Sequence, residues 1–285
     1  MKHIYPILLI MMALAFGGCL PFSYIPNQPR VTTVAAKGQA EVAGTLSTDP
    51  LGYGQAEAHL TMAPTNHLLI TAHAGAAGLE KDRHNAFIFF GNTRTYYDIR
   101  NRHLSAGLGL GTFGKWGSNA TWYAQAGTDY AQVSTRYRYG YQNPDVNVDS
   151  GFVKAQGRFL MPWVQLGARF GVGKNKELWP RWSLIAAIRL SELLRRNYSY
   201  EVNVVNGNPL EEPARFGPPR MHLLMQAQFG GELALENGLA FQFTLSMANR
   251  QDNDRLLGYG LFQAGAGVSY CFGNREAWKA GTRLE

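Results

Sequence analysis

Apolar and polar residues alternate with a period of two along most of the chain after residue 37, a pattern typical of β-strands with two different faces. In residues 239–247, Leu, Phe, Phe, Leu and Met occupy one face, while Gln, Thr and Ser lie on the other. Residues 191–196 are the best local candidate for an amphipathic helix, and they fit a strand extension equally well. The pattern predicts ten strands, at about residues 38–48, 54–62, 67–76, 103–113, 119–139, 151–171, 181–194, 219–231, 238–249 and 260–272.

The connections between these strands form two sets that alternate along the chain. Short connections at 63–66, 114–118, 172–180 and 232–237 alternate with mostly longer ones at 49–53, 77–102, 140–150, 195–218 and 250–259. Outer-membrane barrels have short periplasmic turns and longer extracellular loops. An even number of strands also leaves both termini on the periplasmic side. We therefore expect an all-β fold, a single antiparallel up-and-down β-barrel of the outer-membrane type spanning residues 38–272.

The composition of the strand faces indicates which face meets lipid. A soluble barrel turns its apolar face inward, whereas a membrane barrel turns it outward. The polar faces carry Gln, Ser, Thr and Gly rather than Lys and Glu, which suits a narrow lumen better than a solvated surface. A soluble, lipocalin-like barrel that holds an apolar ligand is the alternative. Aromatic residues expected in membrane-surface girdles are Trp122, Tyr123, Tyr130, Trp163, Trp179, Trp182, Tyr270 and Phe272.

The last predicted strand contains the most specific motif, formed by Gln263, Gly265, Val268, Tyr270 and Phe272. It resembles the terminal β-signal that the outer-membrane insertion machinery reads. An unpaired strand edge can add to another sheet, and the apolar face of this strand would be displayed to lipid. The predicted partners are therefore the insertion machinery during assembly and the lipids of the outer membrane. Residues 273–285 follow as a periplasmic tail.

The N-terminus has the features of an export signal. A basic start and an apolar stretch at 4–16 precede Gly17-Gly18-Cys19, so residues 1–18 read as a signal peptide. Small residues before a cysteine resemble the bacterial lipobox, which predicts lipidation of Cys19 and stable membrane attachment through several acyl chains. Ordinary cleavage that leaves a free Cys19 is the alternative. Residues 19–37 contain three prolines and no clear periodicity, and we interpret them as a lipidated tether. Cys271 would then have no disulfide partner.

Short elements after the cysteine resemble a known group of proteins. They are Tyr24-Ile25-Pro26-Asn27, Lys37-Gly38-Gln39, the stretch from Gln55 to Ile70 that contains Asn66-His67, and residues 159–167. The group consists of small, largely uncharacterised outer-membrane lipoproteins of Bacteroidetes type. The resemblance implies a lipid-anchored barrel and carries over no catalytic residues. Two departures are Gln39 in place of the usual Glu and an unusually long loop at 195–218.

Composition narrows the possible functions. The chain has 285 residues with 27 Lys or Arg and 20 Asp or Glu, so its net charge is 27 − 20 = +7, and only 16% of residues are charged. Many aromatics exclude disorder, and two cysteines exclude a disulfide scaffold. The cationic excess lies mainly in predicted loops, where anionic lipid headgroups, surface polysaccharide or an envelope protein are better partners than nucleic acid. No nucleotide-binding or metalloprotease motif is present, and no cofactor is expected.

The inward faces gather acids, histidines and arginines that could form a general acid–base site. A narrow ten-stranded barrel must fill its lumen, so we favour structural ion pairs. Glu57, His59 and His73 could bind a metal, although the pattern arises easily in a polar lumen and no metal is expected. We expect a non-enzymatic structural, scaffold or adaptor protein or a restricted pore; the alternative is a barrel hydrolase or lipid-modifying enzyme. The polar cluster consists of Glu57, His59, His73, Asp129, Arg169, Arg189 and His222, with Glu41 nearby.

Overall fold

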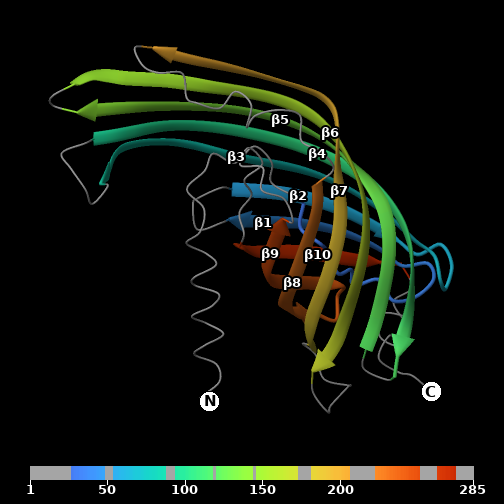
Figure 1. Cartoon of the computed structure of the whole chain (residues 1–285). Coiled ribbons are helices and arrows are strands. Elements are labelled where there is room, and N and C mark those ends of the chain that lie inside the picture. Colours follow the sequence, from blue (N-terminus) through green and yellow to red (C-terminus); the bar gives the residue numbers. More distant parts are fainter. Residues whose placement is uncertain are drawn as a thin grey trace.

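A computed structural model describes residues 27–48, 54–87, 94–117, 120–143, 146–172, 181–205, 222–250 and 262–273. Ten antiparallel strands form a closed barrel in which each strand pairs with its neighbour in sequence and β1 pairs with β10 (Figure 1). This confirms the predicted all-β, up-and-down barrel. The strands are β1 (Ala40–Thr48), β2 (Gly54–Met62), β3 (Leu69–Phe87), β4 (Arg94–Trp116), β5 (Ala120–Asn143), β6 (Val146–Val172), β7 (Arg181–Val205), β8 (His222–Ala234), β9 (Leu239–Arg250) and β10 (Phe262–Phe272).

The barrel has a turn end and a loop end. The turn end is where β2, β4, β6 and β8 finish, at Met62, Trp116, Val172 and Ala234, and where β1 starts and β10 finishes. Here the Gly38 N–H donates to the Ala63 carbonyl at 2.8 Å, and the Cys271 N–H donates to the Gly238 carbonyl at 2.9 Å. Gly273 has a φ of 105°, and a Cβ on it would lie 2.1 Å from the Gly38 carbonyl oxygen. Glycine therefore allows the two ends of the barrel chain to meet closely at the seam.

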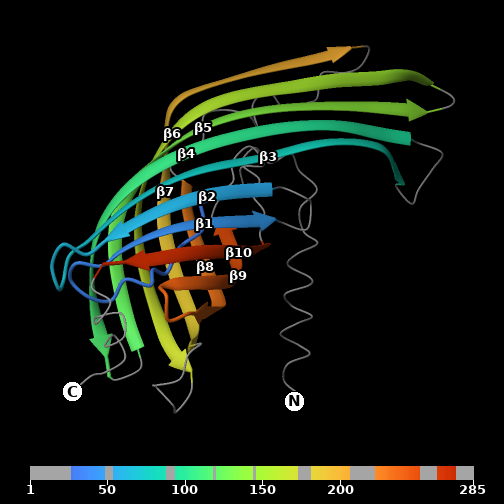
Figure 2. The ribbon, with the colours of Figure 1, turned by 180° about the vertical axis from the view of Figure 1, so that it is seen from behind.

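The wall is higher on one side than on the other. Strands β3 to β7 have 19–27 residues, whereas β1, β2, β8, β9 and β10 have 9–13, so five strands extend far beyond the rest at the loop end (Figures 1 and 2). The predicted loops at 77–102, 140–150 and 195–218 were therefore too long. Their flanks continue as paired strands, with the β4–β5 pairing reaching Arg94 and Gln142. Alternation of apolar and polar residues weakens there, although backbone pairing continues.

The outward face of the barrel is apolar, as predicted, in the part from the turn end to the height of the short strands. Leu108 is 66% exposed, Leu184 58% and Phe243 62%, and further apolar side chains lie on the same face of other strands. A continuous exposed apolar surface of this kind belongs against lipid. It contradicts the soluble, lipocalin-like alternative, whose apolar face would point inward. No helix among the described residues is long and apolar enough to cross a membrane.

Aromatic side chains mark the membrane boundary near the turn end. Trp116, Trp122 and Trp182 are exposed beside the turns, and Tyr270 and Phe272 are exposed at the end of β10. These positions match the aromatic girdle of membrane barrels. Tyr130 is also exposed, at 44%. The prediction of Tyr123 and Trp163 as girdle residues is wrong, because both are buried with inward-facing residues. Trp179 lies outside the described residues.

The core of the protein is the filled interior of the barrel. One buried apolar cluster lies toward the turn end and contains Val31, Val34, Ala63, Leu69, Phe113, Tyr123, Ile185 and Ala187. A second lies toward the loop end and contains Ala131, Val133, Phe159, Met161, Leu193, Leu224 and Ala248. Buried Gln, Ser, Thr and charged side chains occupy much of the remaining interior. The candidate site lies in this polar part.

Candidate functional site

The N-terminal part of the described chain occupies the lumen. Residues 27–34, which we call the lumenal segment, are all buried, from 9% exposure at Arg30 to 0% at Val34. Residues 19–37 were expected to be a tether, but the described part of this region enters the barrel before β1. The segment reads Asn-Gln-Pro-Arg-Val-Thr-Thr-Val, so it presents donors and acceptors that a polar lumen can satisfy.

The first two residues of the lumenal segment bind around the middle of the barrel. The Asn27 side-chain amide donates to Asp129 Oδ2 at 3.0 Å and accepts from the Ser105 hydroxyl at 2.7 Å. The Gln226 amide donates to the Asn27 carbonyl at 2.9 Å. The Gln28 backbone N–H donates to Glu57 Oε1 at 3.0 Å. Residues from β2, β4, β5 and β8 thus hold this end of the segment.

Farther along the segment, Arg30 and Glu41 form a buried ion pair. Arg30 Nη2 lies 2.7 Å from Glu41 Oε1, and the two side chains are 9% and 1% exposed. Arg30 also donates from Nη1 to Gln242 Oε1 at 3.0 Å. Thr32 donates its hydroxyl to the other Glu41 oxygen, and Thr33 donates both its hydroxyl and its backbone N–H to it. One carboxylate on β1 therefore holds the three polar side chains that flank Val31.

Glutamines of the wall bind the backbone of the segment. The Gln165 amide donates to the Arg30 carbonyl at 2.7 Å, and the Gln242 amide donates to the Val31 carbonyl at 3.2 Å. Glycine makes room beside them. A Cβ on Gly75 would lie 3.1 Å from Asn27 Oδ1, and a Cβ on Gly265 would lie 3.2 Å from Gln28 Oε1. The glutamines and glycines on the inward faces thus fit the wall to the segment.

The histidines of the predicted cluster each meet a carboxylate. His59 Nε2 lies 3.2 Å from Glu57 Oε2, and His73 Nε2 lies 3.0 Å from Asp129 Oδ1. The two imidazole rings are 5.8 Å apart between centroids. Gln55 also donates to Glu57 Oε1 at 2.8 Å. The two pairs therefore lie side by side on β2, β3 and β5, next to the start of the lumenal segment.

Trp163 is part of this cluster, although the sequence analysis assigned it to the girdle. Its indole N–H donates to Asp129 Oδ1 at 2.6 Å, and the Arg189 guanidinium lies 4.6 Å from its ring centroid. Arg189 Nη1 is also 3.9 Å from Asp129 Oδ2. Asp129 consequently contacts Asn27, His73 and Trp163, with Arg189 near by. Asp129 thus connects the histidine cluster to the lumenal segment at Asn27, as Glu57 does at Gln28.

The structure separates the other members of the predicted cluster. Arg169 pairs with Glu232 at 2.6 Å toward the turn end, where Gln242 also donates to Glu232 at 2.7 Å. Its partner Glu232 was not recognised in the sequence. His222 lies at the start of β8, and its side chain is outside the described set. Sequence reasoning also missed the lumenal residues Asn27, Gln28, Arg30, Gln165 and Gln242; the inward alternation of glutamine was the available signal for the last two.

The lumen around this cluster is filled. The void beside Gln28, Arg30, Glu57 and His59 measures about 10 Å³. That is the room for one water molecule at most. Among the described residues, no group of three or more His, Cys, Asp or Glu side chains has an arrangement that could hold a metal ion. The acid–histidine pairs therefore have the components of proton-transfer chemistry, but the void that the described residues leave inside the lumen beside Glu57 and His59 is too small for a substrate.

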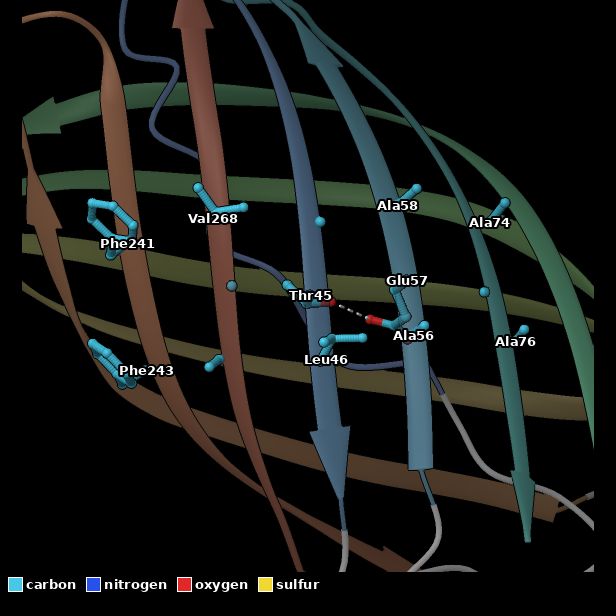
Figure 3. Close-up of a pocket in the computed structure, with 14 residues that line it drawn as sticks. Thr45, Leu46, Ala56, Glu57, Ala58, Ala74, Ala76, Phe241, Phe243 and Val268 are labelled. Carbon is cyan, nitrogen blue, oxygen red and sulfur yellow. Dashed lines mark hydrogen bonds between the residues drawn. The ribbon is translucent and has the colours of Figure 1, made fainter. Parts of the chain in front are cut away.

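A larger hollow lies on the outside of the wall. It measures about 720 Å³ and crosses β9, β10, β1, β2 and β3 (Figure 3). Small residues such as Ala56, Ala58 and Ala74 line it, and Phe241 and Phe243 stand at one side. Glu57 contributes to the hollow but is 6% exposed and accepts from the Thr45 hydroxyl at 3.4 Å. The hollow is a depression in the lipid-facing surface.

The predicted β-signal lies on β10, which closes the barrel against β1. Val268, Tyr270 and Phe272 are 42–46% exposed on the outer face. Gln263 points inward, accepts from the Gln28 amide at 3.3 Å and donates to Gln55 at 3.3 Å. Gly265 borders the lumenal segment. The motif residues thus divide between lipid and lumen, and their reading by the insertion machinery stays a prediction.

Several predictions concern residues that the structure does not describe. The signal peptide at 1–18, the lipidation of Cys19 and residues 274–285 of the tail fall outside the described ranges. Cys271 is buried and has a free thiol. The described chain begins inside the lumen at Asn27, whereas β10 finishes at the turn end. The location of both termini in the periplasm therefore stays a prediction.

The closed barrel, its apolar outer face and its aromatic girdle define an outer-membrane β-barrel protein. No protein-family model matches the chain, and no curated protein matches its sequence. The chain is similar to the N-terminal β-barrel domain of Pseudomonas aeruginosa OprF, with 11% identity, coverage of 83% of this chain and 98% of that one, and a TM-score of 0.30. It is also similar to Acinetobacter baumannii CarO, with 10% identity, coverage of 85% of this chain and 100% of that one, and a TM-score of 0.37. A third similar structure is an outer membrane channel from Pseudomonas putida F1, with 9% identity, coverage of 87% of this chain and 100% of that one, and a TM-score of 0.38.

Proposed function

We propose that this protein is a lipid-anchored outer-membrane barrel whose own N-terminal segment closes the lumen, and that it serves a structural, scaffold or adaptor role. The observation that carries the proposal is the burial of all eight residues 27–34 inside the barrel. Their partners come from both the short and the tall sides of the wall. A lumen occupied in this way supports a closed barrel rather than an open pore.

Electrostatics supports a permanent plug. Arg30 is a close cationic partner of Glu41, and both side chains are buried. Breaking such a pair by removing one partner typically costs ~3–5 kcal/mol, because the remaining charge stays uncompensated. If the segment left the lumen, Glu41 would lose Arg30, Thr32 and Thr33 together. Closure is therefore the favourable state of the assembled barrel.

The same packing argues against catalysis. His59 and His73 each contact a carboxylate, as a general acid–base pair requires. Both pairs are buried, however, and the adjacent void admits at most one water molecule. The outer hollow has Glu57 among its lining residues, but Glu57 is almost fully buried and the lining is mostly apolar. We therefore propose a non-enzymatic role, with ion pairs that hold the lumen together.

The remaining parts of the proposal concern location. We place the lipid on Cys19, the turn end and the C-terminal tail in the periplasm, and the tall side of the wall outside the membrane. Exposed Arg102, Arg136, Lys154 and Arg158 lie on the outward faces of β4, β5 and β6 beyond the apolar zone. Anionic lipid headgroups or surface polysaccharide are suitable partners for these cations. Membership of the Bacteroidetes-type lipoprotein group remains a hypothesis.

Planar-bilayer conductance tests the closed barrel. The wild-type protein should show no steady conductance, whereas a variant with residues 27–34 replaced by eight Gly and Ser residues should form open channels. Arg30→Met is a milder variant that should open intermittently if the larger replacement does not fold. Lys37→Ala is the control, because Lys37 is exposed and lies outside the lumenal segment. Heat-modifiable gel migration would verify that each variant forms a barrel.

Two results would contradict the proposal. Steady conductance by the wild-type protein equal to that of the linker variant would show that the segment does not close the lumen, and would favour the restricted pore. A folded linker variant or a folded Arg30→Met variant without any conductance would show that other side chains block the lumen. Either result would leave the barrel itself intact and would remove the segment from its proposed role.

A further inference from the structure

We propose that the outward face of β4, β5 and β6 binds the phosphate groups of a lipid in the outer leaflet, directly above the apolar zone of the wall. The inference rests on the proposed function, which places the tall side of the wall outside the membrane, and it commits that side to a lipid and not to a polysaccharide. We call the binding surface the cationic face; it consists of the exposed residues Arg102, Arg136, Lys154 and Arg158.

The pairing of the strands brings these cations together. Arg136 on β5 lies directly opposite Lys154 on β6. Arg102 on β4 and Arg158 on β6 lie on either side of β5, and their register partners on that strand are two positions apart. The backbones of these two arginines are therefore about 10 Å apart across the sheet and about 7 Å apart along it. Like charges that face each other across strands destabilise a sheet, so a bound anion would stabilise this one.

Neutral residues separate the cations on these three strands. Gln132 and Gln156 are exposed on the same outward face and add uncharged hydrogen-bonding groups. Among the described side chains of β4, β5 and β6, no Asp or Glu lies on the outward face, since Asp129 points into the lumen. Glu201 is the register partner of Lys154 on β7, where the cationic face ends. A face of one sign of charge and this extent attracts a negatively charged ligand.

The cations begin where the apolar zone ends. Arg102 is two positions from Leu104, which is 61% exposed, and Arg158 is two positions from Leu160 on the same outward face. Lipid headgroups lie directly beyond the hydrocarbon core at this boundary, whereas a polysaccharide extends away from it. Arginine binds phosphate oxygens through two parallel N–H···O bonds, so three of the four cations have the geometry that a phosphate requires.

The apolar surface beside the cationic face has room for an acyl chain. The outer hollow of about 720 Å³ reaches Ala76 on β3 (Figure 3). Ala76 is the register partner of Leu104, and the next outward position on β3, Gly78, is the register partner of Arg102. A lipid whose phosphate contacts Arg102 can therefore lay a chain along the hollow. Phosphate and chain contacts together favour a lipid over a free phosphate ion.

Native mass spectrometry of the full-length protein in detergent micelles tests this lipid site. The probe is a disaccharide lipid with two phosphates (lipid A), titrated as a mole fraction of the micelle, and the readout is the fraction of barrel that carries bound lipid. Arg102→Gln/Arg158→Gln removes two cations from the cationic face. Lys37→Gln/Lys115→Gln is the matched control, because it removes the same charge from two exposed residues near the turn end. Heat-modifiable gel migration would verify that both variants form the barrel.

We expect the arginine variant to need at least a tenfold higher mole fraction of lipid A for half-occupancy, because each cation near a phosphate surface adds to the attraction. The lysine control should stay within twofold of the wild-type protein. Equal occupancy of the arginine variant and the wild-type protein would overturn the proposal. An equal loss in the lysine control would overturn it too, because net charge alone would then explain the binding.

The source of the phosphate is tested in the same titration. An excess of inorganic phosphate should leave lipid A bound, since a free ion makes no contact with the apolar surface. Displacement of lipid A by inorganic phosphate would overturn the lipid site in favour of an ion site. Conductance is a separate measurement on the same variants, so the lipid site can fail while the closed barrel stands, and the reverse.

Discussion

Asp129 shows how much of the interior depends on single positions in the wall. Its carboxylate is 1% exposed and contacts Asn27, His73 and Trp163. This arrangement fits because Gly107 stands opposite it, at the register position of Asp129 on β4. A Cβ at Gly107 would lie 2.2 Å from Asp129 Oδ1 and 2.6 Å from the His73 ring. The glycine is therefore required by close approach, not by backbone conformation.

We predict that Gly107→Ala lowers the free energy of unfolding by about 1–3 kcal/mol, the usual cost of overpacking. The added methyl group would displace Asp129 or His73 from partners that are themselves buried. Urea unfolding in detergent micelles, followed by tryptophan fluorescence, would measure the change. Gly44→Ala is the matched control, because Gly44 lies on β1 with nothing within 4 Å of its Cβ position. Equal stability of the two variants would contradict this account of Gly107.

At the scale of elements, the alternating pattern of the strands was sufficient to predict their number, order and outward faces. Lipid on one side and a narrow lumen on the other impose a period of two, which can be read locally. The lumenal segment could not be predicted in this way. It contains Pro29 and pairs with no strand, and its contacts join residues as far apart as Gln28 and Gln263, which are separated by 235 positions.

The candidate site was predictable to the extent that its members lie on strands. Inward alternation placed Glu57, His59 and His73 on one face, and the β2–β3 register brings His59 opposite His73. Trp163 was misassigned because a tryptophan near a strand end suits a girdle, whereas this one binds Asp129 in the lumen. Arg169 was correctly predicted to face the lumen, but it pairs with Glu232 nearer the turn end and not with the histidine cluster. The position of a side chain along the barrel axis depends on the register between strands, which the pattern within one strand does not reveal.

The lipid-facing zone makes a prediction that depends on depth. Leu108 is 66% exposed on β4, near the middle of the interval between Arg102 and Trp116. Leu108→Arg should destabilise the barrel in lipid vesicles by about 2–4 kcal/mol, as expected at the bilayer midplane. Gly54→Arg, at the loop end of β2, should cost only about 0–1 kcal/mol near the interface. Urea titration of both variants in vesicles would measure the difference, and equal costs would show that this wall does not span lipid as described.

At the scale of the whole molecule, the barrel and its plug must assemble together. The lumenal segment continues into β1 through residues 35–39, and β1 forms the closing seam with β10. Its contacts extend to β2, β4, β5, β6, β8, β9 and β10. Because residues 27–34 are buried among these strands and lead directly into β1, the segment has to be in place when β1 meets β10. The seam must therefore close around it.

This order of assembly distinguishes flexible from folded cargo at the N-terminus. We predict that a rapidly folding domain inserted directly before Asn27 reduces the amount of heat-modifiable barrel at least tenfold, because Asn27 is buried inside the barrel and a lumen that holds one extended chain cannot also hold a folded domain. An unstructured Gly–Ser insert of the same length at the same position should leave barrel formation within twofold of wild type. The same domain fused after Gly273, at the turn end, is the control and should be tolerated. Normal barrel formation with the folded domain in place would contradict this order of assembly, because it would show that the barrel closes without residues 27–34 in its lumen.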